Sequence, residues 1–224
     1  MSSPVVVAEH VTKSYGRGEA RVLAVDDVTL EVGAGEFLLV RGPSGSGKTT
    51  LLHCLSTIAT PDSGRIALDG TDLAEMDDDA KSDLRARAMG FVFQRFNLLP
   101  ALKVSENVDL PLVLQGLDRD EVTRRSSEAL RTVGLEDRSG AFPDQLSGGQ
   151  VQLAAVARAL VSEPRVIWAD EPTGALDSEA AQRVLTTLRA IVDSGGTLVL
   201  VSHDPAVEEF ADRVITLRDG RLEA

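Results

Sequence analysis

One stretch decides the fold of this chain: Phe37-Leu38-Leu39-Val40-Arg41, followed by Gly42-Pro43-Ser44-Gly45-Ser46-Gly47-Lys48-Thr49-Thr50. A short apolar run predicts a strand, the glycine-rich segment predicts a loop, and the residues from Thr49 onward begin a helix. The loop matches the P-loop pattern G-x-x-x-x-G-K-[ST] in the strand-then-helix context that the pattern requires. The alternative, a structural glycine-rich turn, is disfavoured by the flanking strand and helix. We therefore predict that the chain binds a nucleoside triphosphate.

The chemistry of this loop explains why these residue types occur together. Glycines let the backbone curl so that several N–H groups point inward, and the N-terminus of the next helix adds a partial positive charge. Lys48 can then reach the β- and γ-phosphates, and the Thr49 hydroxyl can ligate Mg²⁺. The residues expected to bind the nucleotide here are Gly42, Ser44, Gly45, Ser46, Gly47, Lys48, Thr49 and Thr50.

Composition limits the function classes. The chain has 224 residues, of which 43% are hydrophobic, enough for one buried core with a subdomain. A net charge of -12 argues against a general nucleic-acid binder. One cysteine and three histidines leave neither a disulfide framework nor a zinc cluster, and we expect Cys54 to be a buried thiol. No signal peptide and no apolar run near the ~20 residues of a membrane span are visible, which predicts a cytoplasmic chain that reaches a membrane only through a partner.

A second motif supplies acidic chemistry downstream. The apolar run Val166-Ile167-Trp168-Ala169 ends in Asp170-Glu171. An Asp at the end of such a strand can hold Mg²⁺, and the adjacent Glu can polarise an attacking water as general base. A surface Asp-Glu turn is the alternative. Together with the P-loop, the pair predicts triphosphate hydrolysis.

The rest of the chain reads as an α/β core with a helical insertion. Strands are expected at 5–11, at 22–32 as a strand pair, and at 90–94, which ends in the polar Gln94. From Arg95 to about Leu160, apolar residues recur at helical spacing. The apolar strand Thr197–Val201 then runs into His203. Tyr15, placed on the loop after the first strand, is either a half-buried core ring or a ring that stacks on adenine.

The string Leu146-Ser147-Gly148-Gly149-Gln150 also has phosphate-binding chemistry. Ser147 can cap the following helix, and the two glycines expose backbone N–H groups at its positive end. One nucleotide cannot easily be held by two such helix ends within one small domain. A second chain could supply the other contact.

Taken in order from about Val5 to Leu222, these motifs resemble the ATP-binding cassette (ABC) ATPases. The resemblance implies an α/β fold: a P-loop NTPase (RecA-like) core with an antiparallel β subdomain and an inserted α-helical subdomain. It also implies a single nucleotide-binding domain over 1–224, with the core at 1–94 and 163–224. The helical subdomain with the signature motif would then occupy 95–162.

The same resemblance assigns roles to individual residues. ATP and Mg²⁺ are the implied cofactors, and ATP hydrolysis is the implied reaction. The implied catalytic residues are Glu171 as base, His203 as γ-phosphate sensor, Lys48 and Gln94. Besides the loop residues, the implied nucleotide-binding residues are Tyr15, Ser147, Gly148, Gly149, Gln150 and Asp177. The implied magnesium ligands are Thr49, Gln94 and Asp170.

A finer resemblance concerns the partner. The strings Gln94–Pro100, Glu106–Val108, Leu110-Pro111 and Ala169–Gly174 are similar to those of cassettes for lipoprotein release, macrolide and antimicrobial-peptide export, and cell division. This implies a homodimer formed through ATP on the inner face of the membrane. It also implies an integral membrane permease with few spans and a large extracytoplasmic domain. A groove around Gln94 and Leu98–Val104 would take a cytoplasmic helix of the permease, unless those apolar residues are subdomain core.

Two departures and two rivals accompany this interpretation. Val151-Gln152-Leu153 stands where the family commonly has Gln-Gln-Arg, so a charge near the dimer face is missing. Trp168 stands where an aliphatic residue is usual, and we interpret it as a residue that packs in the core. One rival is a soluble cassette without a permease, such as an iron–sulfur assembly factor. The other is a DNA-repair or translation cassette, which usually carries coiled-coil insertions or tandem cassettes that this chain lacks; no nucleic-acid partner is expected.

Overall fold

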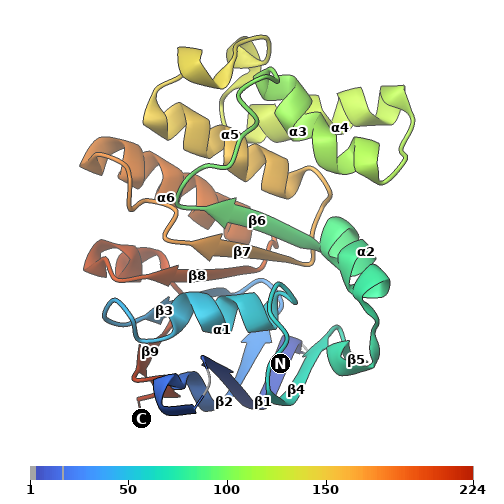
Figure 1. Ribbon diagram of the computed structural model, residues 1–224. Coiled ribbons are helices and arrows are strands. Elements are labelled where there is room, and N and C mark those ends of the chain that lie inside the picture. The colour runs from blue at the N-terminus through green and yellow to red at the C-terminus, as the bar shows by residue number, and fades with distance from the viewer. Residues whose placement is uncertain (1–3, 17, 224) are drawn as a thin grey trace.

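A six-stranded sheet carries the P-loop in the computed structural model, which describes residues 4–16 and 18–223 (Figure 1). Its strand order is β10-β9-β3-β8-β7-β6, and its neighbours are parallel except for the closing hairpin β9–β10. The strands are β3 (Phe37–Arg41), β6 (Met89–Phe93), β7 (Val166–Asp170), β8 (Leu198–Ser202), β9 (Arg213–Arg218) and β10 (Arg221–Leu222). Because the core strands are parallel, their carboxyl ends meet at one edge, where ligands bind in such sheets.

A four-stranded antiparallel sheet lies beside it, in the order β2-β1-β4-β5. Its strands are β1 (Pro4–Tyr15), β2 (Val22–Gly33), β4 (Ser63–Leu68) and β5 (Thr71–Asp72). Two sequence expectations are wrong here. The segment 22–32 forms one strand rather than a pair, and Tyr15 ends strand β1 rather than lying on a loop, because β1 and β2 stay paired as far as Tyr15 and Val22.

The helices divide between the two faces of the parallel sheet. Helix α1 (Lys48–Leu55) packs between the two sheets, and α6 (Ser178–Asp193) covers the opposite face. The remaining α-helices are α2 (Asp78–Ala88), α3 (Val104–Leu114), α4 (Arg119–Thr132) and α5 (Gly148–Leu160). Short 3₁₀ helices occupy Gly18–Ala20, Leu73–Glu75, Glu136–Arg138, Pro143–Gln145 and Pro205–Phe210. Within the described residues, none of the helices is both long and apolar enough to cross a membrane.

Alternating side chains of the parallel strands build two hydrophobic cores. Leu39 and Ile167 point into a core with α5 and α6, whereas Leu38 and Trp168 point into a core with α1 and the antiparallel sheet. Continuous apolar strands are typical of a parallel sheet that is buried on both faces. Trp168 is 1% exposed, which confirms its expected role in core packing.

The predicted fold class is confirmed: a P-loop NTPase core, an antiparallel sheet and inserted helices α3, α4 and α5 between β6 and β7. The exact division into 1–94 with 163–224 and 95–162 stays a prediction. Cys54 is buried as expected, and burial raises the pKa of its thiol to about 11.

Candidate nucleotide-binding site

The P-loop joins β3 to α1 and forms one side of a pocket of about 290 Å³. Its lining residues are Ala24, Ser44, Gly45, Gly47, Lys48, Thr49, Thr50 and Glu171. Gly47 has a φ of 100°, and a Cβ at this position would lie 1.9 Å from the carbonyl oxygen of Ala24. Glycine is therefore required here by both backbone conformation and space.

Two polar side chains of the loop differ in their hydrogen bonding. Lys48 is 6% exposed, and its Nζ donates to the carbonyl oxygens of Gly42 and Pro43 at 2.8 and 2.9 Å. The buried Ser46 Oγ has no hydrogen-bond partner among the described residues. A bound anion is the kind of group that satisfies such an orphaned hydroxyl.

Thr49, the first residue after Lys48, contacts the carboxyl end of β7. The Thr49 hydroxyl donates to Asp170 Oδ1 at 2.9 Å, across the edge of the sheet. Burial raises the pKa of the Asp170 carboxyl, while the hydrogen bond from Thr49 acts in the opposite direction. Hydroxyl and carboxylate oxygens are ligands that Mg²⁺ accepts, so this pair fits the ion that the fold family implies.

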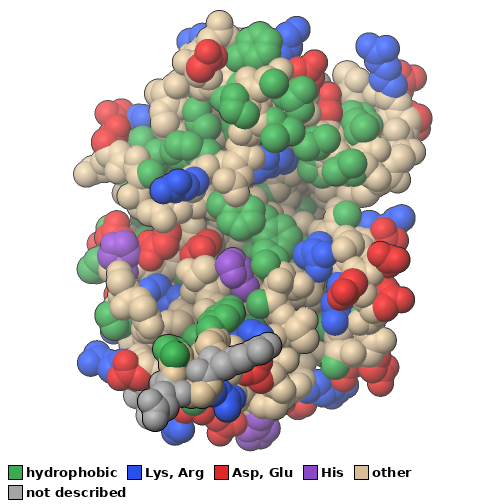
Figure 2. Space-filling view, in the orientation of Figure 1, with side chains coloured by type: hydrophobic (Ala, Val, Ile, Leu, Met, Phe, Trp, Pro, Cys, Tyr) green, Lys and Arg blue, Asp and Glu red, His purple; other side chains and the backbone are tan. Residues whose placement is uncertain are grey.

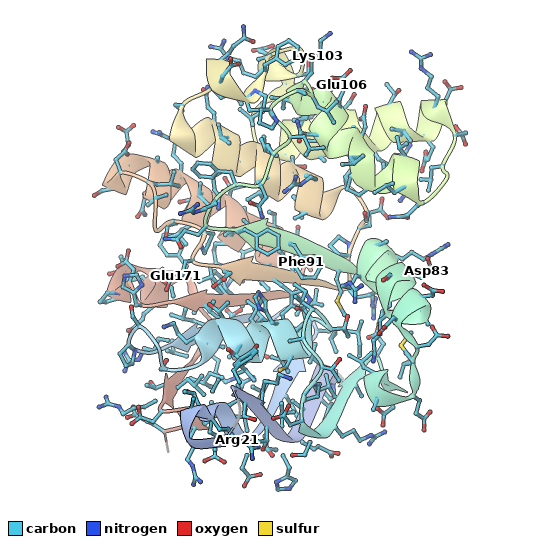
Figure 3. The ribbon with its side chains drawn as sticks, in the orientation of Figure 1. Arg21, Asp83, Phe91, Lys103, Glu106 and Glu171 are labelled. Atoms are coloured by element: carbon cyan, nitrogen blue, oxygen red, sulfur yellow. The ribbon has the colours of Figure 1, made fainter. Side chains whose placement is uncertain are left out.

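Glu171 lies one residue beyond Asp170 in a strained conformation. Its φ is 47°, a left-handed value that is uncommon outside glycine. The turn is held by a hydrogen bond from Glu171 N to Val201 O at 3.0 Å. The carboxylate contacts His203 Nδ1 at 2.8 Å and accepts from Ser202 Oγ at 3.4 Å. Figure 3 shows Glu171 at the edge of the sheet beyond β7, where it also lines the P-loop pocket.

Tyr15 is an exposed ring rather than a half-buried core ring, since 48% of its surface is accessible. Lys13 Nζ lies 5.5 Å from the ring centroid and pairs with Asp62 Oδ1 at 3.1 Å. Asp62 also accepts from the backbone N and the hydroxyl of Ser14, and these bonds lower its pKa to about 2. The network fixes the end of β1 while leaving the ring open for a stacking partner.

The signature residues cap a helix outside this pocket. Ser147 Oγ accepts from Gln150 N at 3.3 Å, and Gln150 Oε1 accepts from Ser147 N at 3.0 Å, which makes a capping box at the start of α5. Gly148 and Gly149 form the first turn. None of these four residues lines the P-loop pocket. The chain therefore does not bring its own signature to its own P-loop.

Two further predicted residues make no hydrogen bond to the Thr49–Asp170 pair within the described residues, although Phe93, just before Gln94, is in register with Asp170. Asp177 caps α6 by accepting from Ala180 N at 2.8 Å. Gln94 follows β6 and packs against Gly174. A Cβ at position 174 would lie 2.7 Å from Gln94 Nε2. Within the described part of the chain, no hydrogen bond joins Gln94 to Thr49 or Asp170. Their predicted functional roles remain predictions.

Sequence reasoning missed Gln152, a fully buried amide on α5. Its Nε2 donates to the carbonyl oxygens of Phe93 at 3.1 Å and Pro172 at 2.7 Å. Phe93 directly precedes Gln94, and Pro172 directly follows Glu171. The available signal was a glutamine among the apolar residues of α5, whose neighbour Leu153 is buried in the core of the inserted helices.

The predicted permease groove around Gln94 and Leu98–Val104 stays a prediction, and part of that segment lies in the core, the alternative that the sequence left open. Val104 is buried and Leu98 packs against the same core, whereas Leu99 stays 45% exposed. An apolar groove of about 500 Å³ lies between α2, β6, α3 and the end of α5. The segment 98–104 does not line it, because buried Asn107 bonds to backbone groups of Leu99, Leu102 and Lys103 and holds that segment against α3.

Comparison with known proteins identifies the family to which this chain belongs. A protein-family model described as "ABC transporter" matches residues 25–174. The chain belongs to the ABC transporter family.

Several relatives of this ABC protein match along nearly all of its length. An uncharacterized ABC transporter ATP-binding protein of Methanocaldococcus jannaschii is 39% identical over 97% of each chain. The macrolide export ATP-binding/permease protein MacB of Shigella flexneri is 43% identical over 98% of this chain, which covers 34% of MacB. The solved dimeric, post-hydrolysis ATP-binding cassette MJ0796 with ADP and Pi has a TM-score of 0.88 and 40% identity, covering 98% of this chain and 97% of that one.

These findings confirm the predicted ABC membership and activity. The chain is the ATP-binding, ATP-hydrolysing subunit of an ABC transporter. The relatives reported above give no support to the iron–sulfur assembly alternative.

Proposed function

We propose that two copies of the chain bind ATP head to tail, each nucleotide lying between the P-loop of one copy and Ser147–Gln150 of the other. The observation that carries this proposal is the composition of the pocket. Lys48, Thr49 and Glu171 line it, while the signature residues do not. The capped N-terminus of α5 has backbone N–H groups and a partial positive charge suited to a phosphate. The related cassette MJ0796 is described as dimeric.

The proposed chemistry divides among the residues at the sheet edge. Lys48 would exchange its two carbonyl contacts for the β- and γ-phosphates, and the loop from Gly42 to Thr50 would bind the phosphates through backbone N–H groups. Thr49, Asp170 and Gln94 would hold Mg²⁺, whose charge offsets that of the phosphates. Glu171 would take the proton of the attacking water, with His203 hydrogen-bonded to its carboxylate. Tyr15 would stack on adenine, and Asp177 would lie at the dimer interface.

The proposed partner is a membrane permease with few spans and a large extracytoplasmic domain. The chain would attach to it peripherally, on the inner face of the membrane, and drive export, lipoprotein release or mechanical transmission. Support comes from MacB, whose name describes an ATP-binding protein and a permease in one chain. The groove beside β6 is the docking surface that this proposal uses.

Replacing Glu171 with Gln tests the hydrolytic site. We expect Glu171→Gln to bind ATP but to hydrolyse it about 10²–10⁴-fold more slowly, because the amide cannot accept the proton of water. The closed dimer should accumulate, and size-exclusion chromatography with ATP would detect it.

Glu128→Gln provides the matched control, since the Glu128 side chain is 65% exposed on α4 and does not line the P-loop pocket. It should keep wild-type turnover and remain in the wild-type monomer–dimer equilibrium. Unchanged turnover in Glu171→Gln would remove Glu171 from the role of base. If Glu171→Gln stays monomeric with ATP, that result would argue against a nucleotide site shared between two copies.

A further inference from the structure

The hairpin of β9 and β10 packs against the P-loop from the side that faces away from the nucleotide pocket. Strand β9 runs parallel to β3 as far as the pair Arg41 and Thr216, so Leu217 lies beside Gly42, where the loop begins. In Figure 1 the P-loop lies at the left end of α1, with β9 and β2 below it. The described lining of the P-loop pocket includes none of the hairpin residues 213–222.

Leu217 of β9 contacts both ends of the P-loop. A Cβ at Gly42 would lie 2.1 Å from Leu217 O, and a Cβ at Gly47 would lie 3.5 Å from Leu217 Cδ2. Glycine at position 42 is what lets the loop lie this close to the backbone of β9. The Leu217 side chain is fully buried in the core between the two sheets, so its position is fixed by packing.

The turn of the hairpin adds two hydrogen bonds. Asp219 and Gly220 join β9 to β10 with φ values of 48° and 80°, the two positive values that a two-residue type I′ turn requires. Gly220 N donates to Ser46 O at 3.0 Å, and Gly220 O accepts from Asp26 N at 2.8 Å. Gly220 is buried, and it therefore joins the P-loop to strand β2.

The bond to Ser46 sets the direction of an amide in the P-loop. The peptide unit between Ser46 and Gly47 is planar and trans, so its N–H points away from its C=O. Because Ser46 O points to the hairpin, the Gly47 N–H points to the opposite side of the loop, and Gly47 lines the pocket. Inward N–H groups of this kind form the anion-binding surface of a P-loop. The turn therefore holds one such donor in its binding orientation.

An ion pair fixes the hairpin to β2. The Arg221 guanidinium donates to Asp26 Oδ2 at 2.6 Å, and the Asp26 side chain is 20% exposed. Acidic and basic side chains are interspersed over this lower part of the molecule (Figure 2). Asp26 thus holds the hairpin twice, through its carboxylate to Arg221 and through its backbone N–H to Gly220.

We propose that the β9–β10 hairpin holds the P-loop in its phosphate-binding conformation, with Gly220 as a positioning residue for nucleotide binding. The inference rests on the proposed function in one respect, that the P-loop binds the phosphates. Gly220 acts through Ser46 and Gly47 and does not touch the nucleotide. A loop that is already ordered costs less to bind, so the hairpin raises the affinity for nucleotide. Loosening it should weaken binding while Asp170 and Glu171 stay in place.

Comparison of Gly220→Ala with Gly70→Ala tests the proposal. Both glycines are second in an Asp-Gly turn, with φ values of 80° and 78°, so alanine is strained to a similar degree at either position. A Cβ at 220 would lie 3.1 Å from Ala24 O, so the turn has to move and both of its hydrogen bonds are disturbed. A Cβ at 70 meets nothing within 4 Å.

The expected result is a change in affinity for one variant only. Gly220→Ala should raise the Kd for ADP, measured by titration calorimetry, and the KM for ATP about tenfold, with kcat near wild type. Gly70→Ala should lose similar thermal stability and keep the wild-type Kd. Equal Kd values for the two folded variants, or a loss in kcat with an unchanged KM, would overturn the proposal.

Charge exchange supplies the second measurement, and it decides the question alone if Gly220→Ala does not fold. Arg221→Asp should raise the Kd for ADP about threefold, since two carboxylates then face each other, and adding Asp26→Arg should restore part of the affinity. An unchanged Kd in Arg221→Asp, or no rescue, would overturn the proposal. Lys48→Ala reports separately on the proposed function. Wild-type binding in Lys48→Ala would overturn the P-loop as phosphate site, whereas loss there with wild-type binding in Gly220→Ala would overturn the role of the hairpin alone.

Discussion

Gln152 shows how one buried side chain can connect two parts of a catalytic site. Its amide bonds to Phe93 O and Pro172 O, so α5 is attached to the residue before Gln94 and to the residue after Glu171. Through these two bonds, a shift of α5 relative to the sheet would move both backbone segments. We therefore propose that Gln152 positions Glu171 and Gln94; it does not itself line the P-loop pocket.

Replacing Gln152 with Met tests this positioning role. Gln152→Met keeps the volume but removes the donor to the buried Pro172 O and one of two donors to Phe93 O, at a cost of about 1–3 kcal/mol in the free energy of unfolding. We expect kcat to fall while KM for ATP stays near wild type, because the P-loop is untouched. Steady-state ATPase kinetics, with thermal unfolding for stability, would measure both.

Gln152→Glu distinguishes positioning from a purely structural effect. A buried carboxyl has a raised pKa, and only its protonated form can donate to one of the two carbonyls. The ratio of variant to wild-type kcat should therefore rise as the pH is lowered from about 8 to about 6. A ratio that is flat with pH, or a loss confined to KM, would contradict the positioning role.

At the scale of elements, the capped start of α5 combines a structural and a proposed functional role. Ser147 and Asp118 both cap helices, α5 and α4 respectively. Replacing either with Ala should lower the free energy of unfolding by about 1 kcal/mol. Only Ser147→Ala should also lower ATPase activity, because its hydroxyl is proposed to contact the nucleotide held by the other copy. Chemical denaturation and ATPase assays on both variants check this, and equal activity losses would contradict it.

At this scale, the sequence predicts those features whose geometry depends on residues close together in the chain. The P-loop, the Asp170-Glu171 strand end and the Ser147 cap are contiguous motifs, so their local geometry follows from neighbouring residues. The strand end at Tyr15 depends instead on pairing with Val22, and the groove walls depend on α2, α3 and α5 packing around β6. Such contacts join residues far apart in the chain. Gln152 was missed for the same reason.

At the scale of the whole molecule, the P-loop and the signature of one chain do not meet in one pocket. One chain has both elements, yet the pocket is lined by P-loop residues, Ala24 and Glu171 and by none of the signature residues. A two-fold axis that places α5 of one copy over the P-loop of the other solves this for both copies at once, since such an interface uses the same surfaces twice. Each of the two sites then contains residues of both chains.

Mixing two inactive variants tests that arrangement. Lys48→Ala impairs the P-loop, and Ser147→Arg blocks the signature, so neither variant should hydrolyse ATP alone. In an equimolar mixture about half the dimers contain one copy of each, and each mixed dimer has one intact site, so about a quarter of wild-type activity should return. Mixing Lys48→Ala with Glu171→Gln is the control, because both changes fall on the P-loop side and no intact site can form. Activity in the control, or none in the first mixture, would contradict turnover at a site shared between copies.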